Sequence, residues 1–435
     1  MEITQICATE ANLHLHKHVR FKGHVQTIRR MGNLVFLVLR DRTGTIQAVV
    51  DNQALVAQTD SLACECPVVL QGQLFPHPRG GAVELRAESI ELLSLTTATL
   101  PVEVGKSSKV ESLTLSAMLD YRPLTLRNPK VRSIFKVAAA ICRAFREFLQ
   151  SEGFTEIHSP KIVSTGTEGG AQLFGVEYFG KQAYLAQSPQ FYKQMMVGVF
   201  ERVFEIGPVY RAEEHDTTRH LNEYISMDFE MGFIESEQDI IAMQTRLLSH
   251  IFSFLNQFCS EELKLYGAAV PHFDSIPQIA LSDARQLLKE KYAWKGVSTS
   301  QDLDPEGERL LCEHFAASAN SDLVYVTRYP VSLRPFYAMP APCGQLSASF
   351  DLLFRGLEVT TGGMRIHEPE KLVATMEKRG LDPSSFGDYL QCFQYGMPPH
   401  GGLAIGLERL TKQLLGLPNV KLASLFPRDR QRLTP

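Results

Sequence analysis

The chain has 435 residues, more than one domain usually holds, so we predict two or more domains. Hydrophobic residues make up 44% and charged residues 21% of it, a composition typical of globular proteins. The formal net charge of −4 excludes a general attraction to nucleic acid, so any such contact must depend on a local basic surface.

Targeting and redox signals are weak. No apolar run is long enough to span a bilayer, and the start Met1-Glu-Ile-Thr-Gln5 lacks the basic and apolar regions of a signal peptide. The 8 cysteines are scattered, and the spacing of Cys64 and Cys66 matches no zinc ligand pair. We therefore predict a cytoplasmic protein with reduced thiols and no membrane partner.

The first part of the chain is rich in short strand-like runs. They cover residues 19–27, 34–40, 45–50, 68–74 and 82–93, with turns between them. This number and spacing of runs predicts a five-stranded oligonucleotide-binding (OB-fold) barrel. We place this domain at residues 1–97, followed by a proline-containing hinge at residues 98–130.

Basic residues concentrate at the start of this barrel. They are Lys17, Arg20, Lys22, Arg29, Arg30, Arg40 and Arg42, against one acid, Asp41. A local basic face on a protein of balanced charge suits a partner that must bind and then leave. Phe36 lies in the same stretch and offers a ring for base stacking, although a lone phenylalanine is more often a core residue.

The remaining chain, residues 131–435, mixes helix and strand signals. A helix is predicted at residues 131–153, where apolar residues recur at helical spacing up to Gly153, and an extended segment follows to Pro160. Strands are predicted at residues 202–210, 225–234 and 346–355. Residues 263–320 lack strand signals, so we predict a helical insertion there.

The last predicted helix covers residues 403–415 and ends before Gly416. Gly401 and Gly402 precede it, and residues this small would leave the amides of the helix N-terminus open to an anion. Arg409 projects from its second turn, where an ordinary surface arginine is the alternative.

The loop between the strands at 202–210 and 225–234 is densely charged. It begins Arg211-Ala-Glu213 and ends at Tyr224. A guanidinium fork suits phosphate oxygens, and a carboxylate two residues later can accept from an exocyclic amine, so this loop is a candidate triphosphate site. On charge alone, a solvated loop is the alternative.

Three separated segments resemble one family when they are taken together. The helix with the strand ending at Pro160, the hairpin around Arg211, and Gly406-Leu-Glu-Arg409 resemble motifs one, two and three of class II aminoacyl-tRNA synthetases. A basic barrel placed first is typical of the aspartate, asparagine and lysine subgroup. The segments 167–170, 187–194, 356–367 and 425–435 are similar to those of archaeal and eukaryotic aspartyl-tRNA synthetases.

This resemblance implies a fold and a reaction. The fold would be α+β, an OB-fold anticodon-binding domain plus a class II catalytic domain with an antiparallel sheet flanked by helices. The reaction would be the ligase step of protein biosynthesis in which ATP activates L-aspartate as aspartyl-adenylate and the aspartate is transferred to tRNA(Asp). Charging of tRNA(Asn) is left open, and motif one implies a homodimer.

The resemblance also implies roles for individual residues. The catalytic residues would be Arg211, Glu358 and Arg409, with Glu358 and Thr361 holding Mg2+. ATP would contact Arg211, Ala212, Glu213, Arg219, His220, Leu221, Tyr224, Glu358, Gly406, Leu407, Glu408 and Arg409. Aspartate would contact Glu168, Gln190, Phe191, Tyr192, Lys193, Arg211, Thr361 and Arg365. The anticodon would contact Gln26, Phe36, Gln47 and Glu84.

The residue types fit this chemistry. A substrate carboxylate is already ionised at neutral pH, so its attack on phosphorus requires no general base, only positioning and positive charge. Lys193 and Arg365 favour aspartate over asparagine, because an amide would leave buried cations unpaired. Three alternatives remain: an asparagine–tRNA ligase, an adenylate-forming paralogue that charges no tRNA, and an RNA-binding scaffold on the same fold.

Overall fold

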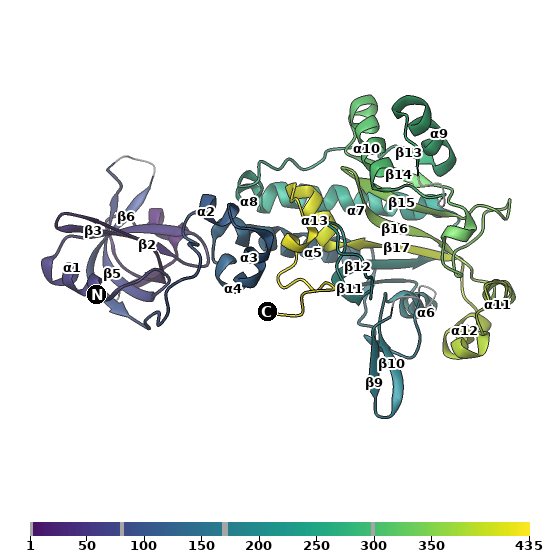
Figure 1. Cartoon of the computed structure of the whole chain (residues 1–435), viewed down its shortest axis with the longest axis horizontal. Helices are drawn as coiled ribbons and strands as arrows, with labels where there is room; N and C mark the ends of the chain where they lie inside the picture. The colour runs from purple at the N-terminus through teal and green to yellow at the C-terminus, as the bar shows by residue number, and fades with distance from the viewer. Residues whose placement is uncertain (1–2, 79–81, 168–172, 297–300) are drawn as a thin grey trace. The chain divides into compact units, whose positions relative to one another are not determined.

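The structure, a computed structural model, describes residues 3–78, 82–167, 173–296 and 301–435. The chain divides into two compact units, Met1–Arg132 and Ser133–Pro435. In Figure 1 the first unit is purple to blue, and the second runs from blue through green to yellow. Each unit has its own hydrophobic core.

The first unit is a closed barrel with one added strand. Its strands in the described part are β1 (Thr4–Ile6), β2 (His18–Met31), β3 (Leu34–Arg40), β4 (Thr45–Val50), β5 (Pro67–Pro76) and β6 (Val83–Leu92). They follow the order β1-β2-β3-β4-β6-β5, and β2 also pairs with β5, which closes the barrel. Alternate residues such as Phe21, Leu37 and Leu70 fill its interior. The predicted OB-fold barrel is confirmed.

Short helices complete this unit. They are α1 (Gln53–Gln58), α2 (Ser107–Glu111), α3 (Leu115–Asp120) and α4 (Arg122–Thr125). The last three lie in the segment 98–130 that was predicted as a hinge. This segment belongs to the same compact unit as the barrel.

Arg40 was predicted to belong to the basic face, and this is wrong. Its guanidinium is buried and forms a fork with Glu65, at 3.0 Å from Nη1 to Oε1 and 2.7 Å from Nη2 to Oε2. Arg127 adds a third bond to Glu65 at 3.0 Å. These partners are distant in sequence, so a count of local charges could not reveal that Arg40 is neutralised inside the unit.

The second unit is built on a large sheet. Its strands in the described part are β7 (Thr155–Glu156), β11 (Arg202–Tyr210), β12 (Glu223–Gly232), β13 (Gln278–Ala280), β14 (Leu323–Thr327), β15 (Ser349–Phe354), β16 (Leu357–Arg365) and β17 (His400–Gly406). The order is β13-β14-β15-β16-β17-β12-β11-β7. The pairs from β14 to β11 are antiparallel, and β13 and β7 join the edges in parallel. A smaller sheet contains β8 (Ile162–Val163), β9 (Gly175–Tyr178) and β10 (Lys181–Leu185).

The two faces of the large sheet differ in chemistry, because successive strand residues point to opposite sides. On one face, Met227, Phe229, Leu403 and Ile405 are fully buried. On the other face, β12 presents Ser226, Asp228 and Glu230, and the β17 residues paired with them are Gly406, Ala404 and Gly402. A row of polar side chains beside a row of very small residues leaves space for a cavity on this face.

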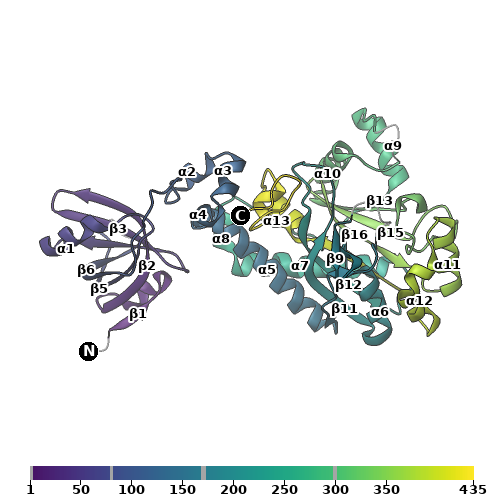
Figure 2. The same cartoon turned by 60° about the horizontal axis from the view of Figure 1, so that its bottom comes forward.

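Helices cover both faces of the sheet. They are α5 (Pro129–Ser151), α6 (Gln190–Phe200), α7 (Glu237–Phe258), α8 (Ser260–Lys264), α9 (Leu281–Tyr292), α10 (Pro305–Ala319), α11 (Pro369–Lys378), α12 (Gly387–Gln394) and α13 (Leu407–Leu415). Helix α7 packs against β16 and β17. Figure 2 shows α6, α11 and α12 grouped at one end of the unit, where their apolar residues share a cluster. Among the described residues, no helix is long and apolar enough to cross a membrane.

The last predicted helix begins four residues later than expected. Residues 400–406 form β17, and α13 starts at Leu407 with Gly406 as its N-cap. Gly401 and Gly402 therefore lie inside a strand and do not precede a helix N-terminus. A Cβ on Gly402 would lie 2.0 Å from the carbonyl oxygen of Phe229 and 2.3 Å from Oε2 of Glu230, so the glycine lets a carboxylate lie flat against the strand.

Candidate active site

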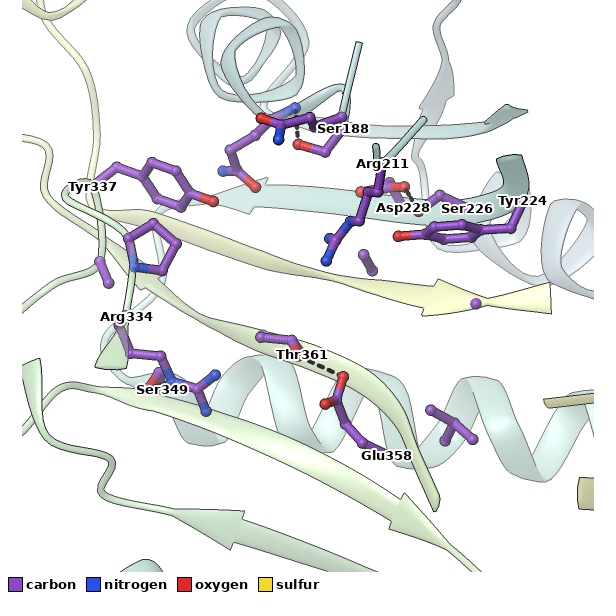
Figure 3. Close-up of a pocket in the computed structure, with 18 of the residues that line it drawn as sticks. Ser188, Arg211, Tyr224, Ser226, Asp228, Arg334, Tyr337, Ser349, Glu358 and Thr361 are labelled. Carbon is purple, nitrogen blue, oxygen red and sulfur yellow. Dashed lines mark hydrogen bonds between the residues drawn. The ribbon is translucent and has the colours of Figure 1, made fainter. Parts of the chain in front are cut away.

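A cavity of about 690 Å3 lies over the polar face of the sheet. Its lining comes from α6, the β11–β12 hairpin, β16, the β17–α13 junction and residues 332–338. Figure 3 shows Arg211 and Tyr224 reaching into it from one side, with Arg334, Glu358 and Thr361 on the opposite side. Segments far apart in sequence thus contribute charged groups to one space.

Arg211, Glu213 and Tyr224 form one end of this cavity. Arg211 directly follows β11, and the side-chain amide of Asn222 donates to the carbonyls of Arg211 at 2.7 Å and Glu213 at 2.9 Å. This amide holds the two sides of the loop together. The Arg211 guanidinium carbon lies 5.9 Å from the centre of the Tyr224 ring, and its Nη1 lies 3.9 Å from Oε1 of Glu213. The residues expected at the α-phosphate and at adenine are therefore neighbours.

The residues expected at the outer phosphates also line the cavity. Arg409 donates to the carbonyl of Glu358 at 3.0 Å and lies 3.4 Å from its Oε1. His220 Nε2 lies 3.8 Å from Glu213 Oε2, and burial lowers the pKa of His220, so the ring is mainly neutral at pH 7. Arg219 lies in the same region and is bound to Glu308 of α10.

Glu358 and Thr361 are the residues expected to hold a metal ion. The Thr361 hydroxyl donates to Glu358 Oε1 at 3.2 Å, as Figure 3 shows. Burial opposes ionisation of Glu358, but the positive charges of Arg409 and Arg334 hold its pKa below the ordinary value. Among the described residues, no group of three or more His, Cys, Asp or Glu forms a metal cage. A single carboxylate with a hydroxyl fits Mg2+, which usually takes few protein ligands and completes its shell with water and substrate phosphates.

Asp351 and Arg334 adjoin this carboxylate and were not predicted. Asp351 lies opposite Thr361 in the β15–β16 register. Burial raises the pKa of Asp351 to about 6, although Arg334 Nη2 is 2.9 Å from its Oδ1. Arg334 also donates from Nε to the Ser349 hydroxyl at 3.0 Å.

The far end of the cavity holds an acid–base cluster, made of Lys193, Arg365, Asp228 and Glu230. Lys193 Nζ lies 3.0 Å from Asp228 Oδ1 and 3.3 Å from Glu230 Oε2. Arg365 Nε lies 2.8 Å from Glu230 Oε1, and its Nη2 donates to Gly402 O at 3.1 Å. Gln190 lies at the edge of the cluster, where its Oε1 is 3.4 Å from Arg365 Nη2.

The expectation that an amide would leave Lys193 and Arg365 unpaired needs correction, because Asp228 and Glu230 already pair with them. Burial opposes ionisation of Glu230, but Arg365 and Lys193 hold its pKa below the usual range, so it remains an anion. The cluster therefore offers cations at fixed positions within a balanced set of charges and carries no excess positive charge.

A chain of directed hydrogen bonds supports Gln190 from behind. Gln190 Nε2 donates to Gln194 Oε1 at 3.0 Å, and Tyr389 donates to the same oxygen at 3.0 Å. Gln194 Nε2 is 2.9 Å from His400 Nε2, and His400 Nδ1 is 2.9 Å from Pro398 O. Since the Pro398 carbonyl can only accept, His400 donates from Nδ1 and accepts at Nε2.

Not every predicted residue reaches the cavity. Of the described ones, Ala212, Phe191, Tyr192 and Leu407 do not line it. Phe191 is buried against Phe336, Phe386 and Tyr389, and Leu407 is also buried, so both serve packing. Glu168 lies outside the described residues. The other predicted residues line it: Gln190, Lys193, Arg211, Glu213, Arg219, His220, Leu221, Tyr224, Glu358, Thr361, Arg365, Gly406, Glu408 and Arg409.

Glu408 has a structural task as well. Its two carboxylate oxygens accept from the Ile225 N–H at 3.2 and 3.1 Å, which ties the start of α13 to β12. Burial raises the pKa of Glu408 to about 7.

Three of the residues expected at the anticodon, Phe36, Gln47 and Glu84, share one outer face of the barrel. Gln47 pairs with Glu84 across β4 and β6, and Phe36 lies opposite Arg29 across β3 and β2. Arg29 Nη2 donates to Gln47 Oε1 at 3.0 Å, so it belongs to this face although it was predicted only as part of the basic stretch. Gln26 is the extra residue of a bulge in β2, and its side chain donates to Gly105 O at 2.8 Å.

Family models match most of the chain. Residues 114–430 match the model described as tRNA synthetases class II (D, K and N), and residues 19–93 match the OB-fold nucleic acid binding domain. The chain therefore belongs to the class II tRNA synthetases of the D, K and N group.

Individual relatives match over nearly the full length. An aspartate–tRNA(Asp/Asn) ligase of Deinococcus radiodurans is 49% identical, with 97% of each chain covered. The ligase of the same name from Thermus thermophilus is 46% identical over 99% of this chain and 100% of the relative. The crystal structure of asparaginyl-tRNA synthetase from Pyrococcus horikoshii complexed with asparaginyl-adenylate has a TM-score of 0.92 and 30% identity, with 100% of both chains covered.

Proposed function

We propose that the chain is an aspartate–tRNA ligase that activates L-aspartate with ATP and transfers it to tRNA. One observation carries this proposal: a single cavity has Arg211, Glu213 and Tyr224 at one end and the cluster of Lys193 and Arg365 at the other. The first end suits a nucleotide, and the second suits a small dicarboxylic acid.

In the proposed first step, the α-carboxylate of aspartate attacks the α-phosphorus of ATP and pyrophosphate leaves. Arg211 projects into the cavity from the nucleotide end, and in this proposal its guanidinium would bind both reacting groups and hold them in line. Arg219 and Arg409 would bind the outer phosphates and stabilise the charge that develops on pyrophosphate. Glu358 and Thr361 would hold Mg2+, which neutralises phosphate charge when it is bound.

Aspartate selectivity is proposed to come from the positions of Lys193 and Arg365. Each is held by buried carboxylates and by backbone carbonyls, Leu403 O at 3.1 Å from Lys193 and Gly402 O at 3.1 Å from Arg365. Cations fixed in this way cannot turn toward a different partner. The side-chain carboxylate of aspartate could accept from both cations. The side-chain amide nitrogen of asparagine would instead point an N–H donor at a cation.

The proposed tRNA contact uses the outer face of the barrel. Phe36 offers a ring for a base, and Gln47 with Glu84 offers acceptors and a donor for base edges. Both Deinococcus and Thermus relatives are named for tRNA(Asp) and tRNA(Asn) together. We therefore propose both tRNAs as acceptors for this chain, with aspartate as the amino acid in each case.

A homodimer is the proposed assembly, because motif one, which this chain matches in the helix and strand ending at Pro160, builds the dimer interface in the family. Light scattering should give twice the chain mass of 48.7 kDa at micromolar concentration. The chain mass alone would contradict this proposal.

Charging of purified tRNA pools with labelled aspartate or asparagine tests the function directly. The products are separated by tRNA species. We expect aspartate on tRNA(Asp) and tRNA(Asn) and no asparagine on either. Asparagine on tRNA(Asn) would identify an asparagine–tRNA ligase, and adenylate formation without charging would identify a paralogue that does not act on tRNA.

A further inference from the structure

Helix α10 carries a buried acid into the region of the active site. The helix spans Pro305–Ala319, within the segment predicted as an insertion, and Asp304 caps its N-terminus by accepting from Gly307 N at 2.7 Å. Its apolar side, with Leu311 and Cys312, packs in a cluster with Trp294 and strand β14. Glu308 also lies on the buried side, although a carboxylate is costly to bury unless it is paired.

Glu308 is paired on both sides. Its Oε1 and Oε2 lie 2.8 and 2.5 Å from Nη2 of Arg219, and Oε2 also accepts from the backbone N–H of Glu358 at 3.0 Å. The side chains of Arg219 and Glu308 are only 15% and 10% exposed. One carboxylate thus links the charged loop after β11 to the strand that bears Glu358.

The geometry leaves Arg219 able to bind a ligand. Both bonds to Glu308 use Nη2, and Nε and Nη1 have no hydrogen-bond acceptor among the described residues. Arg219 also lines the cavity. A guanidinium has five donors in a planar fork, so one edge can be held by the protein while the other faces a phosphate.

We propose that Glu308 is a positioning residue that holds Arg219 in place for the outer phosphates of ATP. This inference rests on the proposed function and gives the insertion a role in that function. An arginine that is already fixed loses less side-chain freedom when the nucleotide binds. The entropy lost on ordering Arg219 is therefore largely lost already in the free protein, which favours binding.

The far side of the same loop is fixed independently. Lys421 Nζ lies 2.6 Å from Asp216 Oδ1 and 2.7 Å from Asp429 Oδ2. Because the loop keeps this attachment, loss of the Glu308 charge should release Arg219 without freeing the whole loop. The effect should then be confined to ligands that carry outer phosphates.

The test compares Glu308→Gln with wild type by calorimetric titration with ATP and with AMP, each without aspartate. We expect about tenfold weaker binding of ATP, in line with loss of one charge-assisted hydrogen bond, and unchanged binding of AMP. Glu306→Gln is the matched control: it lies on the same helix, and its carboxylate pairs with exposed Arg309 at 2.7 Å. It should bind both nucleotides as wild type does.

A double-mutant cycle with Arg219→Ala isolates the pair. In the Arg219→Ala background, Glu308→Gln should cause no further loss of ATP affinity. Equal weakening of ATP and AMP would mean that Glu308 only maintains the fold, and tighter ATP binding would mean that it competes with phosphate. Either result, or unchanged ATP binding, overturns the inference. Glu308→Asp, which keeps the charge, should retain most of the ATP affinity, and Glu308→Ala with the same two titrations replaces the glutamine variant if that variant does not fold.

Failure of the proposed function is a separate outcome. If wild type itself binds ATP no more tightly than AMP, and shows no aspartate-dependent exchange of pyrophosphate into ATP, the proposed function fails. If wild type does both and Glu308→Gln is indistinguishable from it, only the role of Glu308 fails.

Discussion

Lys193 and Asp228 form an ion pair at the floor of the cavity, with 3.0 Å between Nζ and Oδ1 and both side chains only 2% exposed. The two residues come from α6 and β12, and the same ammonium group lies 3.3 Å from Glu230. A lysine held between two carboxylates has a fixed position, and in the proposed function this position would distinguish an acid substrate from its amide.

Glu213→Ala should weaken the nucleotide end alone. The carboxylate is the proposed acceptor for the adenine amino group, and loss of one such bond costs roughly 1–2 kcal/mol. We expect the KM for ATP in aspartate-dependent pyrophosphate exchange to rise about tenfold, with the KM for aspartate unchanged. An equal rise in both KM values would contradict this role and would show that Glu213 maintains the structure of the whole site.

Gly402→Ala should destabilise the second unit. The added Cβ would lie 2.0 Å from Phe229 O and 2.3 Å from Glu230 Oε2, so strand and carboxylate must both move. We expect a loss of about 3 kcal/mol in the free energy of unfolding, measured with urea. Gly387→Ala is the control, because nothing lies within 4 Å of its Cβ and its φ of −52° suits alanine. Similar stability changes for both variants would contradict the close packing at Gly402.

His400 should make stability depend on pH. Burial lowers its pKa from 6.5 to about 4, so the unfolded chain binds a proton more readily than the folded one. The stability it contributes is fully present above pH 6.5 and is lost as the pH falls toward 4. Between pH 6.5 and 5 the loss should be about 2 kcal/mol.

The variant His400→Gln tests whether His400 is the source of this pH dependence. Glutamine has no such ionisation, so the difference in unfolding free energy between pH 7 and 5 should shrink by about the same 2 kcal/mol. Urea titrations at both pH values measure it. An unchanged pH dependence would assign the effect to other groups.

Phe36→Ala should separate the two reaction steps. Stacking of a base on an aromatic ring is worth about 1–3 kcal/mol, so the KM for tRNA(Asp) in charging should rise at least about fivefold. Pyrophosphate exchange, which needs no tRNA, should remain at the wild-type rate and serves as the internal control. A parallel loss of exchange would show that the substitution disturbs more than the barrel surface.

The elements of the fold were largely predictable, because strand and helix periodicity are local properties. The barrel strands and the hairpin around Arg211 follow from alternating residues and turn signals. Gly401 and Gly402 were misread, since a glycine pair before an apolar run also suggests a helix start. Close packing in the sheet explains them: an added Cβ would lie 2.3 Å from Glu230 Oε2 at Gly402, and 2.6 Å from both Gly363 O and Ile240 Cδ1 at Gly401.

Partners across the fold could not be read from the sequence. Arg40 looked like a surface cation because Glu65 lies 25 residues away. Asp228 and Glu230 were visible as polar residues in a strand, but their pairing with Lys193 and Arg365 depends on the packing of α6 against β12 and on the strand order that places β16 one strand away from β12. Glu308 lay in a segment without any motif, so no sequence signal pointed to it.

The most direct measurement is pyrophosphate exchange into ATP with aspartate or asparagine as the only amino acid, for wild type and Lys193→Ala, alongside Lys289→Ala as an exposed-lysine control. Wild type and Lys289→Ala should exchange with aspartate alone. Lys193→Ala should lose at least a hundredfold in kcat/KM for aspartate while binding ATP normally, at a temperature where it remains folded despite an unpaired buried acid. Exchange with asparagine by wild type, or undiminished exchange with aspartate by Lys193→Ala, would contradict an aspartate site built on Lys193.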